Sequence, residues 1–402
     1  MKYIIVLGDG MADEPIDSLG GKTPLEAAVT PTMDELAKKS EMGLLHTIPE
    51  GMKPGSDTAN LAVMGYDPKI YYTGRSPLEA LSIGVPMEAA DVALRCNLVT
   101  LSEEEPYEEK ILIDHSSDEI STEDAALLVE ALRKELENEA YRLYPGTSYR
   151  HCLIWKKGEV VELAPPHDHL TQVIGPWLPK DPALLAMQKR SYEILSKHPI
   201  NLERKAKGLH PANSCWFWGA GTKPALTSFE ENYHKKGVMV SAVDLLKGIA
   251  VGAGMRNIIV EGANGGLHTN YEGKAQAAVD ALLKEGYDFA YIHVEAPDEM
   301  GHQGSVERKI QAIQYLDQRV ILPVKEQMDA SGEPYRLLIL PDHPTPIRVR
   351  THTADPVPYL LYDSTAPQEH SWNYNEREAA ESGKYLAQGH EMMGYFLSWK
   401  TE

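Results

Sequence analysis

Three predicted strands of this chain are followed closely by aspartate or histidine, side chains that commonly bind catalytic metal ions. In open α/β sheets, ligands bind beyond the carboxyl ends of the strands, so side chains at these positions can meet in one place. A fourth group, in the motif THTADPVP at 351–358, adds one more histidine. The candidate ligands are Asp9, Asp298, His302, Asp342, His343 and His352.

The spacing of these residues favours two metal ions. Asp298 and His302 are four residues apart, so one helical turn would put both on the same face. Asp342 and His343 are adjacent and must diverge, which suits ligands of two neighbouring ions. Carboxylate and imidazole ligands without a thiolate fit Mn²⁺ or Zn²⁺, and two ions about 4 Å apart would clamp a phosphoryl group. For Asp9 alone, a helix cap is the alternative interpretation.

Ser56 is the candidate nucleophile. It follows the Gly/Pro-rich loop 49–55 and opens a predicted helix that Gly65 can end. Free N–H groups and the helix dipole at such a start stabilise an incoming phosphate, and a metal on the hydroxyl oxygen would lower its pKa. The alternative is that Ser56, or its neighbour Asp57, only caps the helix.

Helix and strand patterns alternate along most of the chain, which predicts an α/β fold with a doubly wound, mostly parallel sheet. The expected strands of this sheet are 3–8, 236–241, 257–260, 288–294 and 336–340. The expected helices around them are 24–40, 242–250, 274–285 and 305–330.

The pattern changes in the first half of the chain. Strands expected at 92–100 and 149–155, with an amphipathic helix at 121–139 between them, predict a small inserted α+β domain. A Pro-rich stretch, 164–182, follows. The expected division is a core of residues 1–88 and 181–402 and an inserted domain of residues 89–180.

The charge balance argues against several classes of partner. The chain has 402 residues, with 39 Lys and Arg against 59 Asp and Glu, and a formal net charge of −20 at pH 7. Duplex nucleic acid and anionic membranes require clustered basic side chains, so neither is expected as the main partner, whereas a small anionic substrate needs only a local positive field. Three widely spaced cysteines argue against a disulfide scaffold. Because the apolar N-terminal run is also too short for a signal peptide, a cytoplasmic protein is expected.

Six motifs together resemble the cofactor-independent phosphoglycerate mutases, in the shorter, archaeal-type branch within the alkaline phosphatase superfamily. The motifs are DGMAD (9–13), PGSDTANLAVMGYDP (54–68), TGRSPLEA (73–80), EAPDEMGHQG (295–304), PDHPTP (341–346) and THTADPVP (351–358). The similarity runs from residue 1 to about 395, and the segment 376–397 resembles the C-terminal helix of that family.

The resemblance implies an alkaline phosphatase-like fold and a reaction that moves a phosphoryl group between the 3- and 2-hydroxyls of glycerate, without 2,3-bisphosphoglycerate. It assigns one metal to Asp298, His302 and His352. It assigns the other metal to Asp9, Ser56, Asp342 and His343, and makes Ser56 the nucleophile that is phosphorylated. The expected ions are Mn²⁺ or Zn²⁺, with Mg²⁺ or Co²⁺ as alternatives between which the sequence does not choose.

If the resemblance holds, the inserted domain is a cap that keeps water from the phosphoserine, since hydrolysis would make the enzyme a phosphatase. The candidate substrate contacts are Arg75, Arg95, Arg150, His151, His167, Asp168 and Lys223. Arginine suits bidentate binding of carboxylate or phosphate. Arg75 stands out because it lies close behind the nucleophile helix, and Arg95 because it interrupts an apolar strand. For each of them, a solvated or paired surface group is the alternative.

Other functions remain open at this point. The chain could be a related phosphotransferase, such as the homoserine kinases proposed among bacterial members that resemble this branch, or a phosphatase or phosphonate hydrolase with the same metals. A non-catalytic metal-binding protein is disfavoured by the complete ligand set with Ser56. His293, His370 and His390 have no evident role, and the sequence indicates neither the general acid/base nor the oligomeric state.

Overall fold

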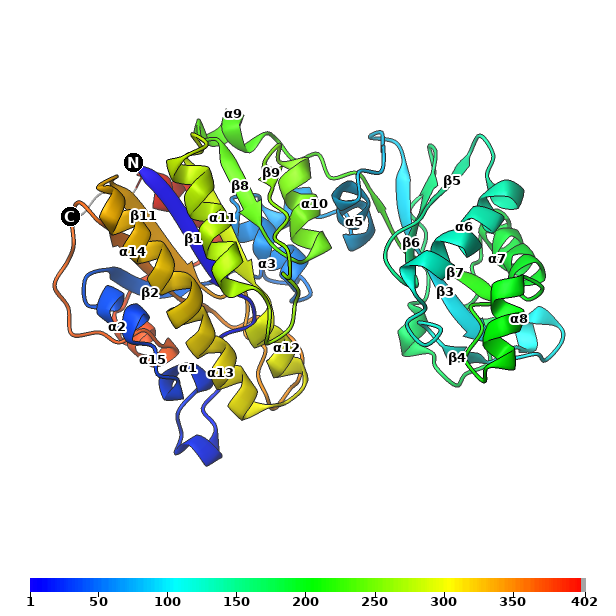
Figure 1. Ribbon diagram of the computed structural model, residues 1–402, viewed down its shortest axis with the longest axis horizontal. Coiled ribbons are helices and arrows are strands. Elements are labelled where there is room, and N and C mark those ends of the chain that lie inside the picture. Colours follow the sequence, from blue (N-terminus) through cyan, green and yellow to red (C-terminus); the bar gives the residue numbers. More distant parts are fainter. Residues whose placement is uncertain (399–402) are drawn as a thin grey trace. The chain divides into compact units, whose positions relative to one another are not determined.

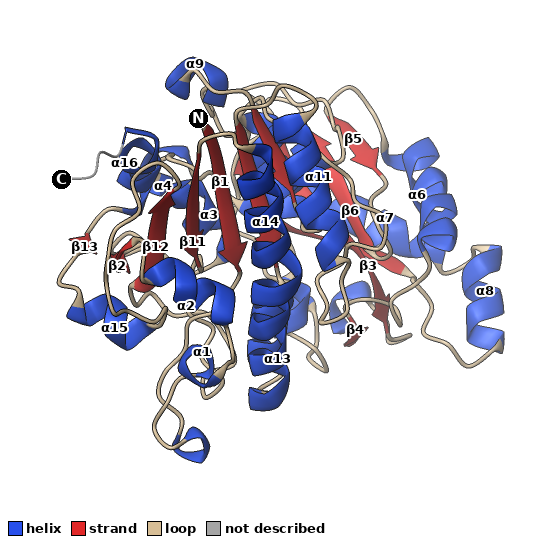
Figure 2. Cartoon of the chain, turned by 60° about the vertical axis from the view of Figure 1, so that its left-hand side comes forward, coloured by secondary structure: helices blue, strands red, loops and turns tan. Residues whose placement is uncertain are grey.

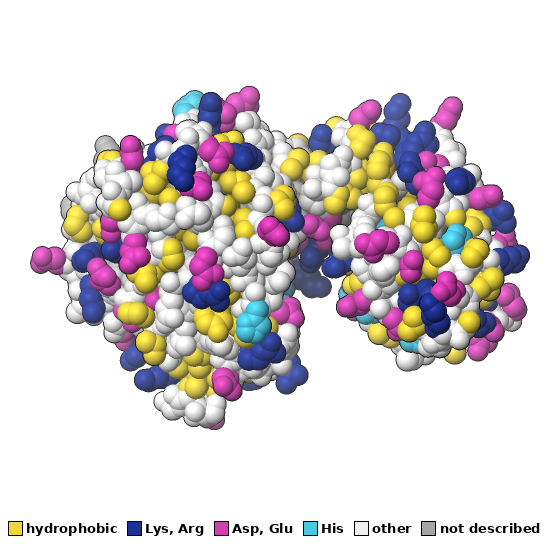
Figure 3. Space-filling view, viewed as in Figure 1, with side chains coloured by type: hydrophobic (Ala, Val, Ile, Leu, Met, Phe, Trp, Pro, Cys, Tyr) yellow, Lys and Arg dark blue, Asp and Glu magenta, His cyan; other side chains and the backbone are white. Residues whose placement is uncertain are grey.

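The protein is described by a computed structural model that covers residues 1–398 of the 402-residue chain. It forms two compact units (Figure 1). The first comprises Met1–Tyr72 and Leu226–Glu402, and the second comprises Thr73–Ala225. Among the described residues, no helix is long and apolar enough to cross a membrane. Acidic and basic side chains are interspersed over the face of the molecule in Figure 3, so the negative net charge is not gathered in one patch there.

The first unit is built on an eight-stranded sheet with the order β13-β2-β12-β11-β1-β10-β8-β9. The strands are β1 (Lys2–Gly8), β2 (Glu41–Leu45), β8 (Gly237–Val240), β9 (Arg256–Asn257), β10 (Phe289–Val294), β11 (Tyr335–Leu340), β12 (Val357–Asp363) and β13 (Tyr385–Leu386). Strands β11, β1, β10, β8 and β9 are mutually parallel, whereas β12 is antiparallel to both of its neighbours. The predicted mostly parallel α/β sheet is therefore confirmed. Because β1, β10 and β11 run the same way, their carboxyl ends lie at one edge.

Helices cover both faces of this sheet (Figure 2). One face carries α1 (Pro24–Ala27), α2 (Pro31–Ala37), α11 (Tyr271–Leu283), α13 (Val306–Leu316), α14 (Leu322–Ser331) and α15 (Glu376–Glu381). The other carries α3 (Ser56–Val63), α10 (Asp244–Gly252) and α16 (Met392–Ser398). Further helices of this unit are α4 (Pro68–Tyr71), α9 (Phe229–Tyr233) and α12 (Ala296–His302). The unit is thus doubly wound, as the alternating pattern predicts.

A π-helical turn, Asp317–Ile321, joins α13 to α14 inside the segment that the sequence predicts as one helix. Such turns are rare and often serve a purpose. Here the turn carries the buried carboxylate of Asp317, which accepts hydrogen bonds from the backbone N–H groups of Met33 (2.7 Å) and Thr32 (3.2 Å). The residue before α2 makes no side-chain cap. Asp317 therefore caps α2 from another helix.

We expect Asp317→Ala to lower the free energy of unfolding by about 2 kcal/mol, because two buried N–H groups at a helix start lose a charged acceptor. Denaturation by urea, followed by circular dichroism, measures the loss. The neighbouring Gln318 is exposed, so Gln318→Ala serves as the matched control and should change stability by no more than about 0.5 kcal/mol. Equal effects of the two substitutions would remove the capping role.

The second unit has an antiparallel sheet with the order β4-β3-β6-β5, and β7 also pairs with β3. Its strands are β3 (Val92–Leu101), β4 (Leu112–Asp114), β5 (Tyr141–Tyr144), β6 (Arg150–Trp155) and β7 (Ser214–Thr222). Its helices are α5 (Arg75–Ser82), α6 (Thr122–Leu136), α7 (Pro182–Leu195) and α8 (Pro199–Ala206). Ser121 caps α6 by accepting a hydrogen bond from the Asp124 N–H. Side chains of α6 and α7 share a core with Leu94, Cys96 and Leu98 of β3, so helices cover this face of the sheet.

The second unit is larger than the predicted insertion, since it spans Thr73–Ala225 rather than 89–180. Sheet pairing explains the difference. Strand β7 returns after the Pro-rich stretch and pairs with β3 from Val92 to Val99. On the other side, α5 is tied to β7 by the Ser76 hydroxyl, which donates to the Gly219 carbonyl oxygen. A proline-rich segment therefore does not end the unit.

Two parts of the first unit also differ from the sequence-based expectation. Strands β2 and β12, which pair with each other, were not predicted. The segment 376–397 is not one helix, because α15 and α16 are separated by the short strand β13. Strand β13 extends the sheet by pairing with β2.

Candidate active site

The carboxyl edge of the first unit's sheet gathers the six candidate ligands. Asp9 directly follows β1, whereas Asp342 and His343 follow β11 after one residue. Asp298 and His302 lie on α12, which begins shortly after β10, and the sixth ligand, His352, lies in the loop before β12. The carboxylates of all three aspartates are buried, and the candidate ligands fall into two clusters.

The first cluster consists of Asp298, His302 and His352. His302 Nε2 lies 3.1 Å from Asp298 Oδ2, and His352 Nε2 lies 3.4 Å from Asp298 Oδ1. The two Nε2 atoms are 3.1 Å apart. Ligand atoms placed about 2.1 Å from a tetrahedral ion lie about 3.4 Å from one another, so these separations fit ligands of a common ion. As the spacing predicts, Asp298 and His302 share one turn of helix α12.

The second cluster consists of Asp9, Ser56, Asp342 and His343. His343 Nε2 lies 3.5 Å from Asp9 Oδ1 and 3.4 Å from Asp342 Oδ2. Ser56 Oγ lies 3.1 Å from His343 Nε2 and 3.5 Å from Asp9 Oδ2. His343 also offers a ligand atom within 4.8 Å of those of Asp298 and His352. It therefore lies between the two clusters.

Backbone contacts fix how two of the histidines face the site. His302 Nδ1 lies 2.9 Å from the Arg350 carbonyl oxygen, and His343 Nδ1 lies 3.2 Å from the Pro344 carbonyl oxygen. A carbonyl oxygen only accepts, so each Nδ1 carries a hydrogen. In the neutral rings the lone pair is then on Nε2, which faces the cluster. This is the arrangement that metal-ligating histidines adopt.

The charges of the site also fit divalent cations. Burial, together with the charges of Asp342 and Asp298, raises the pKa of Asp9 well above its usual value. Oδ1 of Asp9 is buried and has no hydrogen-bond partner among the described residues. Without a cation, the hydrogen bond with Asp298 raises the pKa of His302 to about 9, so His302 carries hydrogens on both ring nitrogens. Although burial acts in the opposite direction, hydrogen bonds from His302 and His352 then hold the pKa of Asp298 well below its usual value, and a bound cation would take the place of these hydrogens. Several buried carboxylates beside imidazole nitrogens form a site that a cation would stabilise.

Ser56 does not cap its helix. Ser56 is the first helical residue of α3, and in this first turn the Thr58 N–H donates to Asp57 Oδ1 (2.9 Å) rather than to Ser56. Its hydroxyl points to Asp9 and His343 instead. Capping by Ser56 is therefore wrong, whereas its neighbour Asp57 does accept one N–H group of the first turn. The earlier N–H groups, those of Ser56 and Asp57, are left for an anion.

Three residues that the sequence did not indicate support this site. Asn60 donates from Nδ2 to Asp342 Oδ2 (2.8 Å) and to the Ser56 carbonyl oxygen (2.8 Å). The hydroxyl of Tyr291 donates to Asn60 Oδ1 (2.6 Å), and His293 Nε2 lies 2.8 Å from Asp9 Oδ2. Two signals were available: Asn60 lies four residues after Ser56 on one helix, and Tyr291 and His293 lie two apart on one buried strand.

The candidate substrate contacts all lie in the second unit, where three arginines form a group that we call the arginine cluster (Arg75, Arg95 and Arg150). Arg75 and Arg95 both pair with Glu79, at 2.8 and 2.9 Å. The Arg95 guanidinium lies 4.3 Å from the centre of the Trp218 ring. Burial lowers the pKa of Arg95, Glu79 opposes this, and the charges of Arg75 and Arg150 lower it further. Arg75 and Arg95 therefore share the carboxylate of Glu79, and Arg150 adds a third positive charge near Arg95.

Three other candidate contacts are exposed. The His167 ring lies 5.2 Å from the Trp218 ring, which connects it to the arginine cluster. Asp168 is next to His167, with its Oδ1 3.6 Å from Nε2. Lys223 directly follows β7 and is exposed. These contacts make His167 a neighbour of the cluster and leave Lys223 at the end of the strand.

The structure does not bring His151 to the arginine cluster. In the β3–β6 pairing, His151 is opposite Cys96, whose side chain lies in the core under α6 and α7, whereas Arg95 is opposite Cys152 on the other face. His151 is 5% exposed, and burial lowers its pKa to about 4. A neutral core histidine on the helix-covered face is therefore the better interpretation of His151.

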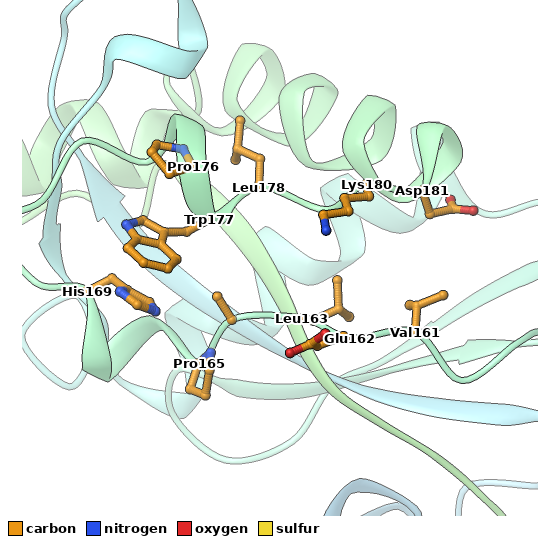
Figure 4. Close-up of a pocket in the computed structure, with 11 residues that line it drawn as sticks. Val161, Glu162, Leu163, Pro165, His169, Pro176, Trp177, Leu178, Lys180 and Asp181 are labelled. Carbon is orange, nitrogen blue, oxygen red and sulfur yellow. The ribbon is translucent and has the colours of Figure 1, made fainter.

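A cavity of about 560 Å³ lies elsewhere in the second unit. The rings of His169 and Trp177 stack along its wall, with centroids 3.8 Å apart. Figure 4 shows these two rings at one end of the cavity and Lys180 and Asp181 at the other. His169 therefore belongs to this cavity, although it follows His167 and Asp168 closely in the sequence.

Comparisons with known proteins complete the description. Residues 37–201 match the model of a family described as 2,3-bisphosphoglycerate-independent phosphoglycerate mutase. A protein of that name from Methanosarcina barkeri is 47% identical over 406 residues, which cover 100% of both chains. A probable one from Geobacter sulfurreducens is 46% identical, with 99% of this chain and 100% of its own covered.

Two solved structures are similar over nearly their whole length. A protein from Pyrococcus horikoshii has a TM-score of 0.82 and 30% identity, with 100% of this chain and 99% of its own covered. A cofactor-independent phosphoglycerate mutase from Thermoplasma acidophilum has a TM-score of 0.68 and 26% identity, with 99% of both chains covered.

Proposed function

The chain belongs to the family of 2,3-bisphosphoglycerate-independent phosphoglycerate mutases, and from that premise we propose that it interconverts 3-phosphoglycerate and 2-phosphoglycerate through a phosphoserine on Ser56. The names of its relatives favour this reaction over the kinase and hydrolase alternatives. One observation supports the role of Ser56 above the others: its hydroxyl lies 3.1 Å from His343 Nε2 at the start of a helix that it does not cap.

In the first half of the reaction, Ser56 Oγ attacks the phosphorus of 3-phosphoglycerate. The bond from phosphorus to the substrate's O3 breaks, O3 takes up a proton, and the serine gives one up. The N–H groups at the start of α3 favour the negative charge of the phosphoryl group. Asn60 donates hydrogen bonds to the Ser56 carbonyl oxygen and to Asp342. These bonds fix the position of the nucleophile relative to the metal ligands at the edge of the sheet.

In the second half, the retained glycerate turns and its O2 attacks the phosphorus of phosphoserine 56. The bond from phosphorus to Ser56 Oγ breaks, O2 loses its proton, and the serine hydroxyl is restored. The two halves together move one phosphoryl group within one molecule, so neither a nucleotide nor water is consumed. Proton transfer to and from the glycerate oxygens requires a general acid/base.

We propose that Asp298, His302 and His352 hold one divalent cation, and that Asp9, Ser56, Asp342 and His343 hold the other. Bound cations would supply positive charge beside the phosphoryl group and lower the pKa of the serine hydroxyl. Carboxylate and imidazole donors favour Mn²⁺ or Zn²⁺, with Mg²⁺ or Co²⁺ as alternatives. The buried, unpartnered Oδ1 of Asp9 supports this assignment, because it is a ligand atom without another use.

The arginine cluster is proposed to bind the carboxylate or the phosphate of the substrate. The charges of Arg75 and Arg150 both act on the guanidinium of Arg95, so three cationic side chains lie near one another and can attract an anion. Arginine also offers paired N–H donors that match these groups. With free thiols at Cys96, Cys152 and Cys215, a reducing cytoplasmic location is the one that we propose.

Arg95→Gln is expected to raise KM for 3-phosphoglycerate by about 10- to 100-fold, because one charged hydrogen bond to the substrate is worth about 1.5–3 kcal/mol. Initial rates over a range of substrate concentrations measure it. Arg133→Gln on α6 is the matched control, since the ion pairs of Arg133 with described residues are those with Glu130 and Glu137 of the same helix and the residue that follows it. An unchanged KM in Arg95→Gln would exclude Arg95 from substrate binding.

The proposed function is tested with purified, Mn²⁺-loaded protein and 3-phosphoglycerate, with ³¹P NMR as the detector. We expect 2-phosphoglycerate to form without a nucleotide. Release of inorganic phosphate instead would identify a phosphatase, and ATP consumption that depends on homoserine would identify a kinase. A folded, metal-loaded protein that forms no 2-phosphoglycerate would exclude the mutase.

A further inference from the structure

His293 is a buried histidine beside the second cluster that the proposed mechanism does not use. It lies on β10 and has no exposed surface. Its Nε2 is 2.8 Å from Asp9 Oδ2, and its Nδ1 is 3.1 Å from the hydroxyl of Ser241, which follows β8. Both ring nitrogens therefore have a partner, and one of these partners is a candidate metal ligand.

The position of the ring hydrogen follows from these two contacts. Ser241 Oγ accepts a hydrogen bond from the Val243 N–H (3.0 Å), so its own hydrogen is available for His293 Nδ1. With Nδ1 as the acceptor, a neutral ring carries its hydrogen on Nε2 and donates it to Asp9 Oδ2. Asp9 must be ionised to bind a cation, and the opposite tautomer would then place a nitrogen lone pair 2.8 Å from a carboxylate oxygen, which is repulsive.

This arrangement is the reverse of that in the candidate ligands. His302 and His343 anchor Nδ1 on backbone carbonyl oxygens and turn the Nε2 lone pair to the site. His293 anchors Nδ1 on a hydroxyl and turns an Nε2 hydrogen to Asp9. A nitrogen that carries a hydrogen does not bind a metal, so His293 is suited to holding a ligand rather than to being one.

We propose that His293, held by Ser241, is a positioning residue that presents Asp9 to a divalent cation. The inference rests on the proposed function, in which Asp9 is a metal ligand. The hydrogen bond from His293 occupies Oδ2 and fixes the rotation of the carboxylate. The other oxygen, Oδ1, is then turned toward His343 Nε2, 3.5 Å away, and it has no hydrogen-bond partner of its own.

The backbone of His293 is held as firmly as its ring. Lys274 Nζ on α11 donates to the His293 carbonyl oxygen (2.9 Å), and the side chain of Lys274 is fully buried. On the neighbouring strand, Leu7 is paired in register with His293, two residues before Asp9. The backbone that carries the imidazole is therefore held in place, as a positioning residue requires.

The test measures the affinity of metal-free protein for Mn²⁺ by competition with a fluorescent chelator, independently of activity. We expect His293→Leu to raise the Kd for Mn²⁺ by about 10- to 100-fold, the usual effect of losing a residue that orients a ligand. His293→Gln keeps an N–H donor and should stay within about 5-fold of the unaltered protein. Ile292→Val on the same strand, whose side chain lies in the opposite core, is the control for strand packing and should leave Kd unchanged.

Asp9→Asn distinguishes a failure of the proposed metal assignment from a failure of the positioning role of His293. If it leaves the Kd for Mn²⁺ unchanged, Asp9 is not a ligand and the proposed metal assignment fails. If Asp9→Asn weakens binding but folded His293→Leu binds Mn²⁺ as tightly as the unaltered protein, only the positioning role is overturned.

A second measurement does not depend on the folding of a His293 variant. Long-range ¹H–¹⁵N spectra of Zn²⁺-loaded, ¹⁵N-histidine-labelled protein, in which a ligating Asp9 is ionised, distinguish the two neutral tautomers. We expect a signal from a ring with its hydrogen on Nε2 that is missing in His293→Gln and altered in Ser241→Ala. A hydrogen on Nδ1 of His293 would overturn the proposal.

Discussion

Ser56→Ala is expected to lower the rate of phosphoglycerate interconversion by at least about 10⁴-fold, because the proposed reaction has no other route for the phosphoryl group. The same substitution should leave the free energy of unfolding within about 0.5 kcal/mol of the original value. The reason is geometric: the hydroxyl makes no capping hydrogen bond and points to Asp9 and His343. A capping serine would show the opposite pattern, with a loss of about 1 kcal/mol in stability and normal turnover.

Three measurements on this variant check the prediction. Initial rates give the loss of activity, urea denaturation gives the stability, and intact mass after acid quench shows whether a phosphorylated protein forms during turnover. Ser382→Ala is the control, since the Ser382 hydroxyl, at the end of α15, donates to the Ala379 carbonyl oxygen and accepts from the Lys384 N–H, neither of which belongs to the candidate site. Normal turnover in Ser56→Ala would exclude Ser56 as the nucleophile, whereas a phosphorylated Ser56→Ala protein would place the phosphoryl group on another residue.

Much of this site could be predicted because the residues that follow parallel strands of one sheet must lie at the same edge of that sheet. Once the runs before Asp9 and Asp342 are recognised as buried parallel strands, their ends must lie at one edge of the sheet. The spacing of Asp298 and His302 then requires only one helical turn, which α12 supplies. The alternating pattern predicted the sheet for the same reason, since buried parallel strands are continuous apolar runs.

The supporting residues could not be predicted, because they depend on pairing between distant segments. His293 reaches Asp9 only because β1 and β10 are neighbours in a particular register. Asp317 caps α2 from a π-helical turn that no periodicity in the sequence reveals. The domain boundary has the same origin, since it is set by the pairing of β7 with β3 and not by composition.

The net charge of −20 describes the whole chain, and it does not determine whether the site attracts or repels an anion. Asp9, Asp298 and Asp342 are buried together at the sheet edge, where carboxylates repel one another and raise the pKa of Asp9. Cations bound there would turn a repulsive group into an attractive one for phosphate. An acidic composition is therefore compatible with an anionic substrate when some of the acidic residues bind metal ions.

His343→Ala is expected to lower kcat by about 10³-fold or more and to reduce the bound Mn²⁺ below about two ions per chain. His343 is the one candidate that belongs to both groups of ligand atoms found among the described residues of the first unit. Its Nε2 lies within 3.5 Å of Asp9, Asp342 and Ser56, so its removal leaves these groups without their shared neighbour. The buried carboxylates then repel each other, which favours a protonated Asp9 over a metal-bound one.

Metal analysis of dialysed protein and initial rates at increasing Mn²⁺ concentrations test this expectation together. His370→Ala is the matched control, because His370 is an exposed histidine of the same unit that bonds to Gln368. It should keep both the metal content and the rate. If high Mn²⁺ restores the rate of His343→Ala, the residue contributes affinity alone; if the metal content is normal and the rate stays low, its imidazole also acts on Ser56. Normal rate and normal metal content in His343→Ala would remove it from the site, because a group 3.1 Å from the nucleophile cannot be lost without effect if the nucleophile is Ser56.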